Sequence, residues 1–131
     1  LKGTFNFDSS GGSTFKLALY TDISGLTTAT TAFTATNEVS TSGTNYTSGG
    51  NALTNNGVAV SSNIAFVDFA DLTFSSVTLS AVGALIYKSS SGNEAVLVLD
   101  FGGTKTATNG DFVVQFPTAN SSSAIIRLGD A

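Results

Sequence analysis

The chain of 131 residues contains no cysteine, histidine, methionine or tryptophan, and it has a single proline. Without cysteine it has no disulfide framework, no thiol nucleophile and no Cys-ligated zinc site. Without histidine it has neither an imidazole base nor the commonest transition-metal ligand. These absences predict a protein that is not an enzyme and that holds no metal or other cofactor.

Charged residues are scarce as well. Five Lys and Arg residues stand against nine Asp and Glu residues, which gives a net charge of −4. So few basic residues under a negative net charge do not build a phosphate-binding surface, so we expect no nucleic-acid partner. No apolar run reaches the roughly 18 residues of a membrane-spanning helix, so we expect no membrane partner either.

What the chain has in abundance is small polar residues: 61 of its 131 residues are Ser, Thr, Gly or Asn. Nevertheless, 41% of the residues are hydrophobic and ten are Phe. Disordered chains are poor in aromatic and β-branched residues, and this chain is not. The length is typical of one domain, so the composition predicts one folded domain with long polar loops.

Short apolar segments in which every second residue is apolar predict strands rather than helices. The expected strands are 14–20, 58–60, 64–69, 72–74, 77–79, 82–88, 94–101, 111–116 and 124–128. Turns are expected at Asn56-Gly57, at Gly102-Gly103 and at Asn109-Gly110. This spacing favours an all-β fold, an antiparallel β-sandwich of jelly-roll-like type with a long Thr/Ser-rich loop region.

The clearest predicted element is a hairpin formed by 82–88 and 94–101. Both of its strands are apolar on both faces, whereas a sheet with one wet face alternates cleanly between apolar and polar residues. We therefore expect both strands to be central in a sheet. A second layer, a loop or a neighbouring subunit would cover each face.

Two segments outside these strands carry isolated aromatic residues. Residues 1–13 form an N-terminal arm or short strand that carries Phe5 and Phe7 and has a Gly/Ser linker, and 14–131 form the single β-sandwich domain. The arm can dock on its own sheet or on that of a neighbour. The Thr/Ser-rich region 21–55 carries Phe33 and Tyr46, which either pin a loop to the sheet or form a contact arm. Phe5, Phe7, Phe33 and Tyr46 are therefore the candidate subunit contacts.

Asp68 and Asp71 are the one carboxylate pair that suggests a Ca²⁺ site or a hydrolase. No Asp-x-Asp-x-Asp-Gly loop surrounds them, and a serine nucleophile in this chain would lack its base. Edge or turn positions are the simpler interpretation, with Asp71 capping a turn into Leu72. An enzyme is therefore the third choice among the function classes.

Several ordered stretches are similar to small virion structural proteins of tailed bacteriophages. These stretches are Phe15–Thr21, Thr34–Ser40, Asn45–Gly50, Phe66–Asp71, Gly83–Tyr87, Val98–Gly102 and Ala124–Leu128. The resemblance covers nearly the whole chain from Phe15 onward and leaves residues 1–13 unmatched. The family offers no catalytic motif to carry over.

The resemblance implies a β-rich, non-enzymatic subunit present in many copies on the exterior of the particle and assembled in the host cytoplasm. A capsid decoration (cement) protein, commonly trimeric and bound to the major capsid protein, is the first choice. A tail, neck or fibre-associated virion protein is the alternative within this class. The strand pattern and Thr-rich loops leave open a different class, an adhesive or carbohydrate-binding β-sandwich module.

Overall fold

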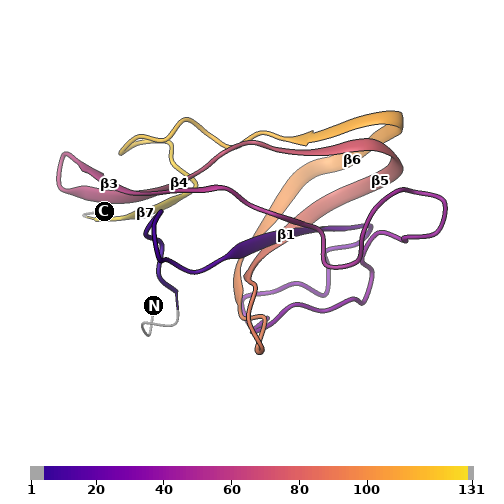
Figure 1. Cartoon of the computed structure of the whole chain (residues 1–131), viewed down its shortest axis with the longest axis horizontal. Coiled ribbons are helices and arrows are strands. Elements are labelled where there is room, and N and C mark those ends of the chain that lie inside the picture. Colours follow the sequence, from indigo (N-terminus) through magenta and orange to yellow (C-terminus); the bar gives the residue numbers. More distant parts are fainter. Residues whose placement is uncertain (1–4, 130–131) are drawn as a thin grey trace.

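The computed structural model describes residues 5–129, and within them it contains strands and no helix (Figure 1). The strands are β1 (Phe15–Tyr20), β2 (Asn51–Ala52), β3 (Asn55–Ser61), β4 (Ile64–Phe69), β5 (Leu72–Lys88), β6 (Ala95–Val114) and β7 (Ile126–Leu128). They form two antiparallel sheets, ordered β2-β1-β5-β6 and β3-β4-β7. The predicted all-β class is confirmed.

Parts of the predicted arm and domain, residues 1–4 and 130–131, lie outside the described residues. Over the described range 5–129, no helix is long and apolar enough to cross a membrane.

The three-stranded sheet begins with a tight hairpin. Ser62 and Asn63 connect β3 to β4, and both have positive φ angles, 52° and 62°. A two-residue turn with this backbone matches the right-handed twist of the strands it joins. The predicted strand 64–69 coincides with β4, and β7 pairs along its other side.

The long β5–β6 hairpin replaces five of the predicted short strands. Segments 72–74, 77–79 and 82–88 are one strand, β5, and the turn predicted at Asn109-Gly110 lies inside β6. The predicted Gly102-Gly103 turn is also an irregularity within β6, because the pairing passes directly from Asp100 to Lys105. These predictions were wrong because bulges and turns require the same residues at positive φ.

The bulges bend the hairpin so that one face follows the main core. Inward side chains of β5 are three residues apart at Phe74–Val77 and at Ala81–Ala84, where the register shifts, instead of the usual two. The main core then gathers residues from both sheets: Phe15, Leu17, Leu19, Phe74 and Ile86 from the first, and Val67 and Phe69 from the second.

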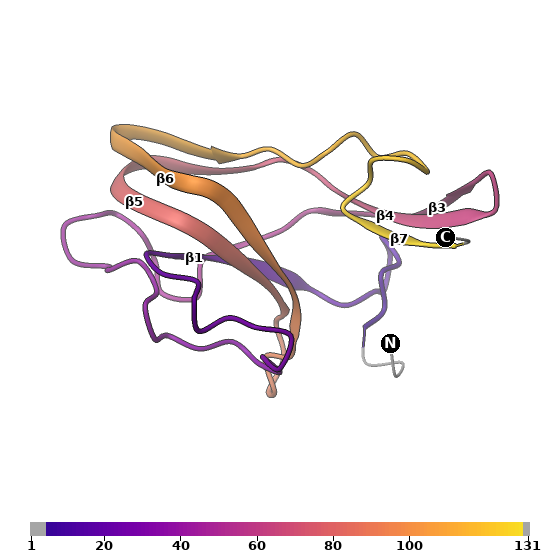
Figure 2. The ribbon, with the colours of Figure 1, turned by 180° about the vertical axis from the view of Figure 1, so that it is seen from behind.

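The segment between β1 and β2 covers the opposite face of the four-stranded sheet, and we call residues 21–50 the crossover segment. Figure 2 shows it in purple beside the lower half of the hairpin. Ile23, Leu26 and Phe33 pack there against Ala18, Tyr20, Leu85 and Tyr87. Gly83 leaves room for this layer, because a Cβ at that position would lie 2.7 Å from Cγ2 of Ile23.

The predicted two-sided cover of the hairpin is therefore confirmed for β5, which lies between β1 and β6. The expectation that both strands are central was wrong for β6, which is the edge of its sheet. Its first residues, 95–99, remain half-buried.

Candidate functional site

Phe5 and Phe7 lie on the chain's own core. The Phe7 ring stacks on Phe15 with the centroids 5.0 Å apart, and Phe5 lies 6.1 Å from Phe7. The amide of Asn55 donates a hydrogen bond of 3.0 Å to the Phe7 carbonyl. Both arm rings are half-buried, so each retains an accessible face.

Phe33 fixes the middle of the crossover segment to the sheet. Its ring stacks on Tyr87 with a centroid distance of 4.8 Å. The Phe33 amide donates to the Asn93 carbonyl at 2.9 Å, and the Ala95 amide donates to the Thr31 carbonyl at 2.9 Å. The crossover segment therefore also covers the first residue of the β6 edge.

Tyr46, the fourth candidate contact, is only 3% exposed and lies in the main core. Its hydroxyl accepts a hydrogen bond from the Leu19 amide at 3.0 Å and donates one to Oε1 of Glu38 at 2.8 Å. The same carboxylate accepts from the Gly49 amide at 2.6 Å and from the Ser48 hydroxyl at 3.1 Å. Glu38 thus holds together two distant parts of the crossover segment and, through Tyr46, strand β1.

The other two tyrosines also bind the crossover segment to the sheet. Tyr20 donates to the Thr34 carbonyl at 2.6 Å, and Tyr87 donates to the Gly49 carbonyl at 2.6 Å. Burial, with the nearby Glu38 charge adding to it, raises the pKa of both hydroxyls above the ordinary tyrosine value. Burial likewise raises the pKa of Tyr46. All three hydroxyls therefore stay protonated donors in the folded protein.

The crossover segment carries two charged residues, the exposed Asp22 near its start and the half-buried Glu38. Between residues 23 and 67 the sequence has one charged residue, Glu38, and its carboxylate is engaged by the contacts above. Most Thr and Ser side chains of the crossover segment are exposed. The protein therefore presents a surface of hydroxyl and amide groups on a backbone that is fixed to the sheet.

Sequence reasoning named Phe33 and Tyr46 as anchors but missed Glu38. The available signal was its isolation, because Glu38 is the one charged residue among the 45 residues from 23 to 67. A half-buried charged group is favoured by several hydrogen-bond donors, and the neighbouring Tyr, Ser and Gly residues supply them here.

Asp68 and Asp71 do not converge on a common site. Asp68 accepts a hydrogen bond from the Asn56 amide at 2.9 Å, and Asp71 accepts one from the backbone amide of Phe116 at 2.8 Å. Asp71 therefore binds the backbone that follows β6 instead of capping a turn into Leu72. No group of three or more Asp, Glu, His or Cys side chains that could hold a metal ion occurs within residues 5–129.

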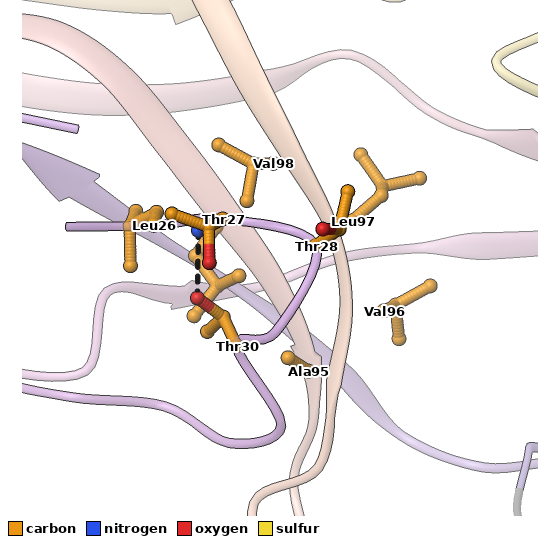
Figure 3. A pocket seen from close by; sticks show the side chains of 9 residues that line it. Leu26, Thr27, Thr28, Thr30, Ala95, Val96, Leu97 and Val98 are labelled. Carbon is orange, nitrogen blue, oxygen red and sulfur yellow. Dashed lines mark hydrogen bonds between the residues drawn. The ribbon is translucent and has the colours of Figure 1, made fainter. Parts of the chain in front are cut away.

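Within residues 5–129, two shallow grooves lie beside the first residues of β6. The first, of about 500 Å³, is lined by Thr27, Thr28 and Thr30 and by apolar residues that include Ala95 and Val98 (Figure 3). The Thr30 hydroxyl accepts a hydrogen bond from the Thr27 amide at 2.8 Å, which holds Thr27 and Thr30 together.

The second groove, of about 450 Å³, is lined by Phe5, Phe7, Val96, Leu97, Ile125, Ile126 and Arg127.

Comparison with protein-family models, with curated proteins and with solved structures found no match to this chain.

Proposed function

We propose that this chain is a non-enzymatic structural subunit of a tailed-phage virion, most specifically a capsid decoration protein that binds the major capsid protein as a trimer on the outside of the head. The observation that carries the proposal is the hydroxyl-rich crossover segment, which is fixed to a sheet and carries only two charged residues, Asp22 and Glu38. A tail, neck or fibre-associated position is the alternative within the particle.

The residues that carry the phage resemblance also build this surface. Tyr20, Glu38, Tyr46, Gly49 and Tyr87 all lie within the stretches similar to virion proteins. The resemblance therefore coincides with the hydrogen bonds that hold the crossover segment in place, and not with scattered surface residues.

A polar surface with little charge suits a lattice contact. Hydroxyl and amide groups form direct and water-bridged hydrogen bonds across an interface without the desolvation of full charges. A fixed backbone reduces the conformational entropy that is lost on binding. Many copies on one particle multiply individually weak contacts through avidity.

At the level of the fold, we propose that the two antiparallel sheets form a β-sandwich of jelly-roll-like type. The shared hydrophobic cluster of Phe15, Phe74, Val67 and Phe69 supports this, because it contains side chains from both sheets. Strand β2 has two residues and β7 has three, so these two strands add little pairing to the sheets of the sandwich.

Immunogold labelling of phage particles from a host culture that produces this chain tests the proposal. We expect label at many positions over the head. Label confined to the tail would replace the decoration role by the tail alternative. Particles that carry no label, while the chain is present in the culture, would contradict a virion role altogether.

The groove lined by Thr27, Thr28 and Thr30 favours a second candidate of another class, a carbohydrate-binding module. Hydroxyls beside apolar side chains match the polar edge and the apolar face of a sugar ring. A glycan array with the isolated chain tests this candidate, and Val98→Lys, which places a charge in the groove, should abolish a real signal. Uniform background binding would remove the candidate.

A further inference from the structure

Strand β3 is an open sheet edge that carries the most exposed valine of the described chain. Within residues 5–129 it pairs only with β4. Val58 is 49% exposed and Val60 is 71% exposed. Proteins usually protect such edges with Pro, Lys or another charged residue, and Asn55–Ser61 contains neither Pro nor a charged residue.

The two valines belong to an apolar surface that crosses the three-stranded sheet. Val60 lies opposite Ala65, which lies opposite Leu128 on the far strand, and Leu128 is 63% exposed. Val58 lies opposite Val67 in the adjacent row, on the same face. Directly paired residues point to the same side of a sheet, so Val58, Val60, Ala65 and Leu128 form one continuous patch.

The backbone of β3 is also available for pairing. The two-residue turn makes Ser61 and Ile64 a hydrogen-bonded pair, and such pairs alternate along an antiparallel ladder. The N–H and C=O groups of Val58 and Val60 consequently point away from β4. Ser9 lies against Gly57, 3.2 Å from the position of a Cβ there, so the N-terminal arm covers only the beginning of the edge.

Most of the β3 sequence reads almost the same in both directions. Gly57-Val58-Ala59-Val60-Ser61 is nearly symmetric about Ala59. When two copies of β3 align antiparallel about that residue, Val58 lies opposite Val60 of the second copy, and no charged residue meets another.

The other edges lack this property. Self-pairing of β6 about Leu97 would bring Glu94 opposite Asp100 of the second copy, where like charges repel. Self-pairing of β7 about Arg127 would place two arginines together, and β2 has two residues only. In these registers β3 pairs with itself without meeting a like charge, and it combines this with two exposed valines.

We propose that two copies of this protein associate through antiparallel pairing of their β3 strands about Ala59, which joins their three-stranded sheets into one continuous sheet. The pairing is isologous, so a two-fold axis passes through Ala59. The pairing involves only one short strand from each copy, so we expect a dimer that forms at high concentration. This inference does not rest on the virion role, because the isolated chain is enough to test it.

Sedimentation velocity over a concentration series tests the pairing. The wild-type chain should dimerise, and Val60→Lys should raise the dimer dissociation constant about tenfold or more. Val113→Lys is the matched control: Val113 is 54% exposed on β6, in the other sheet, so this variant should dimerise like the wild type. Circular dichroism verifies that each variant keeps its strands.

A double variant tests the register itself. Val58→Glu together with Val60→Lys places an acid opposite a base in both halves of the proposed pair, so dimerisation should recover relative to Val60→Lys alone. A double variant no better than the single one would overturn the proposed register. A wild-type chain that stays monomeric up to about 1 mM, the weak limit of specific contacts, would overturn the pairing.

Discussion

At the scale of single residues, Gly50 decides where the crossover segment returns to the sheet. Its φ angle is +76°, and a Cβ at this position would lie within 1.8 Å of the Leu17 carbonyl oxygen. The chain thus passes so close to β1 that only a hydrogen fits between them. The next residue, Asn51, pairs with Leu17 at the start of β2.

Replacement of Gly50 by Ala should therefore destabilise the protein by more than about 4 kcal/mol, the range reached only by exceptional substitutions. Gly43→Ala is the matched control, since Gly43 has a nearly equal φ of +73° but nothing within 4 Å of its Cβ position. It should lower stability by only about 1–2 kcal/mol, from left-handed strain alone. Urea unfolding measures both, and equal losses would show that the contact with β1 is unimportant.

At the scale of elements, the sequence predicts strand positions better than strand lengths. The predicted 64–69 matches β4, and 14–20 differs from β1 by one residue. Segments 72–74 and 77–79 look separate because Ser76 interrupts the apolar pattern. In the structure Ser76 adopts a φ of 53° within β5. A bulge and a turn look alike in sequence, because the pairing that distinguishes them involves residues far along the chain.

Phe33 allows the crossover segment to be tested as an element. Phe33→Ala removes the stack on Tyr87 and should destabilise the protein by about 1–3 kcal/mol, less than loss of a fully buried Phe. We expect faster hydrogen exchange at the amides of Phe33 and Ala95, which donate to the Asn93 and Thr31 carbonyls across this junction. Exchange at Leu19 should not change, since its amide is held by Tyr46. Unchanged exchange at Phe33 would mean that the backbone alone fixes the segment.

At the scale of the whole molecule, every tyrosine of the chain holds the crossover segment, and together they couple its stability to alkaline pH. The folded state raises the pKa of Tyr20, Tyr46 and Tyr87, chiefly through burial. A raised pKa means that the folded state retains its protons longer than the unfolded chain, in which tyrosine ionises near pH 10. Their contribution is therefore complete below about pH 10 and is lost as the pH rises further.

We expect the free energy of unfolding to fall steeply above about pH 10, with tyrosinate absorbance appearing together with the loss of the β-sheet circular dichroism signal. Ionisation and unfolding should be one transition, since the three hydroxyls ionise only when the segment detaches. A gradual rise in tyrosinate absorbance near pH 10 in a protein that stays folded would contradict the coupling.

The candidate site was predictable to a similar extent as the fold. Aromatic residues isolated among Thr and Ser indicated Phe33 and Tyr46 as anchors, because such side chains gain most from burial. The partners of these residues could not be predicted. Tyr46 is hydrogen-bonded to Leu19, 27 residues earlier in the chain, and Tyr87 is hydrogen-bonded to Gly49, 38 residues away. These pairs follow from the path of the backbone, which no local pattern encodes.

Strand β3 also has a consequence for chemical ageing. Asn56-Gly57 is the type of dipeptide that loses its side-chain amide most readily, when the glycine nitrogen attacks the asparagine side chain. Here the Gly57 N–H is bonded to Oδ1 of Asn55 at 2.8 Å, and the Asn56 amide is bonded to Asp68. We expect deamidation at Asn56 to be much slower in the folded protein than in the urea-unfolded chain, as measured by peptide mass mapping after long storage. The same hydrogen bonds that shape the start of β3 would then determine how fast the stored protein is chemically modified at Asn56.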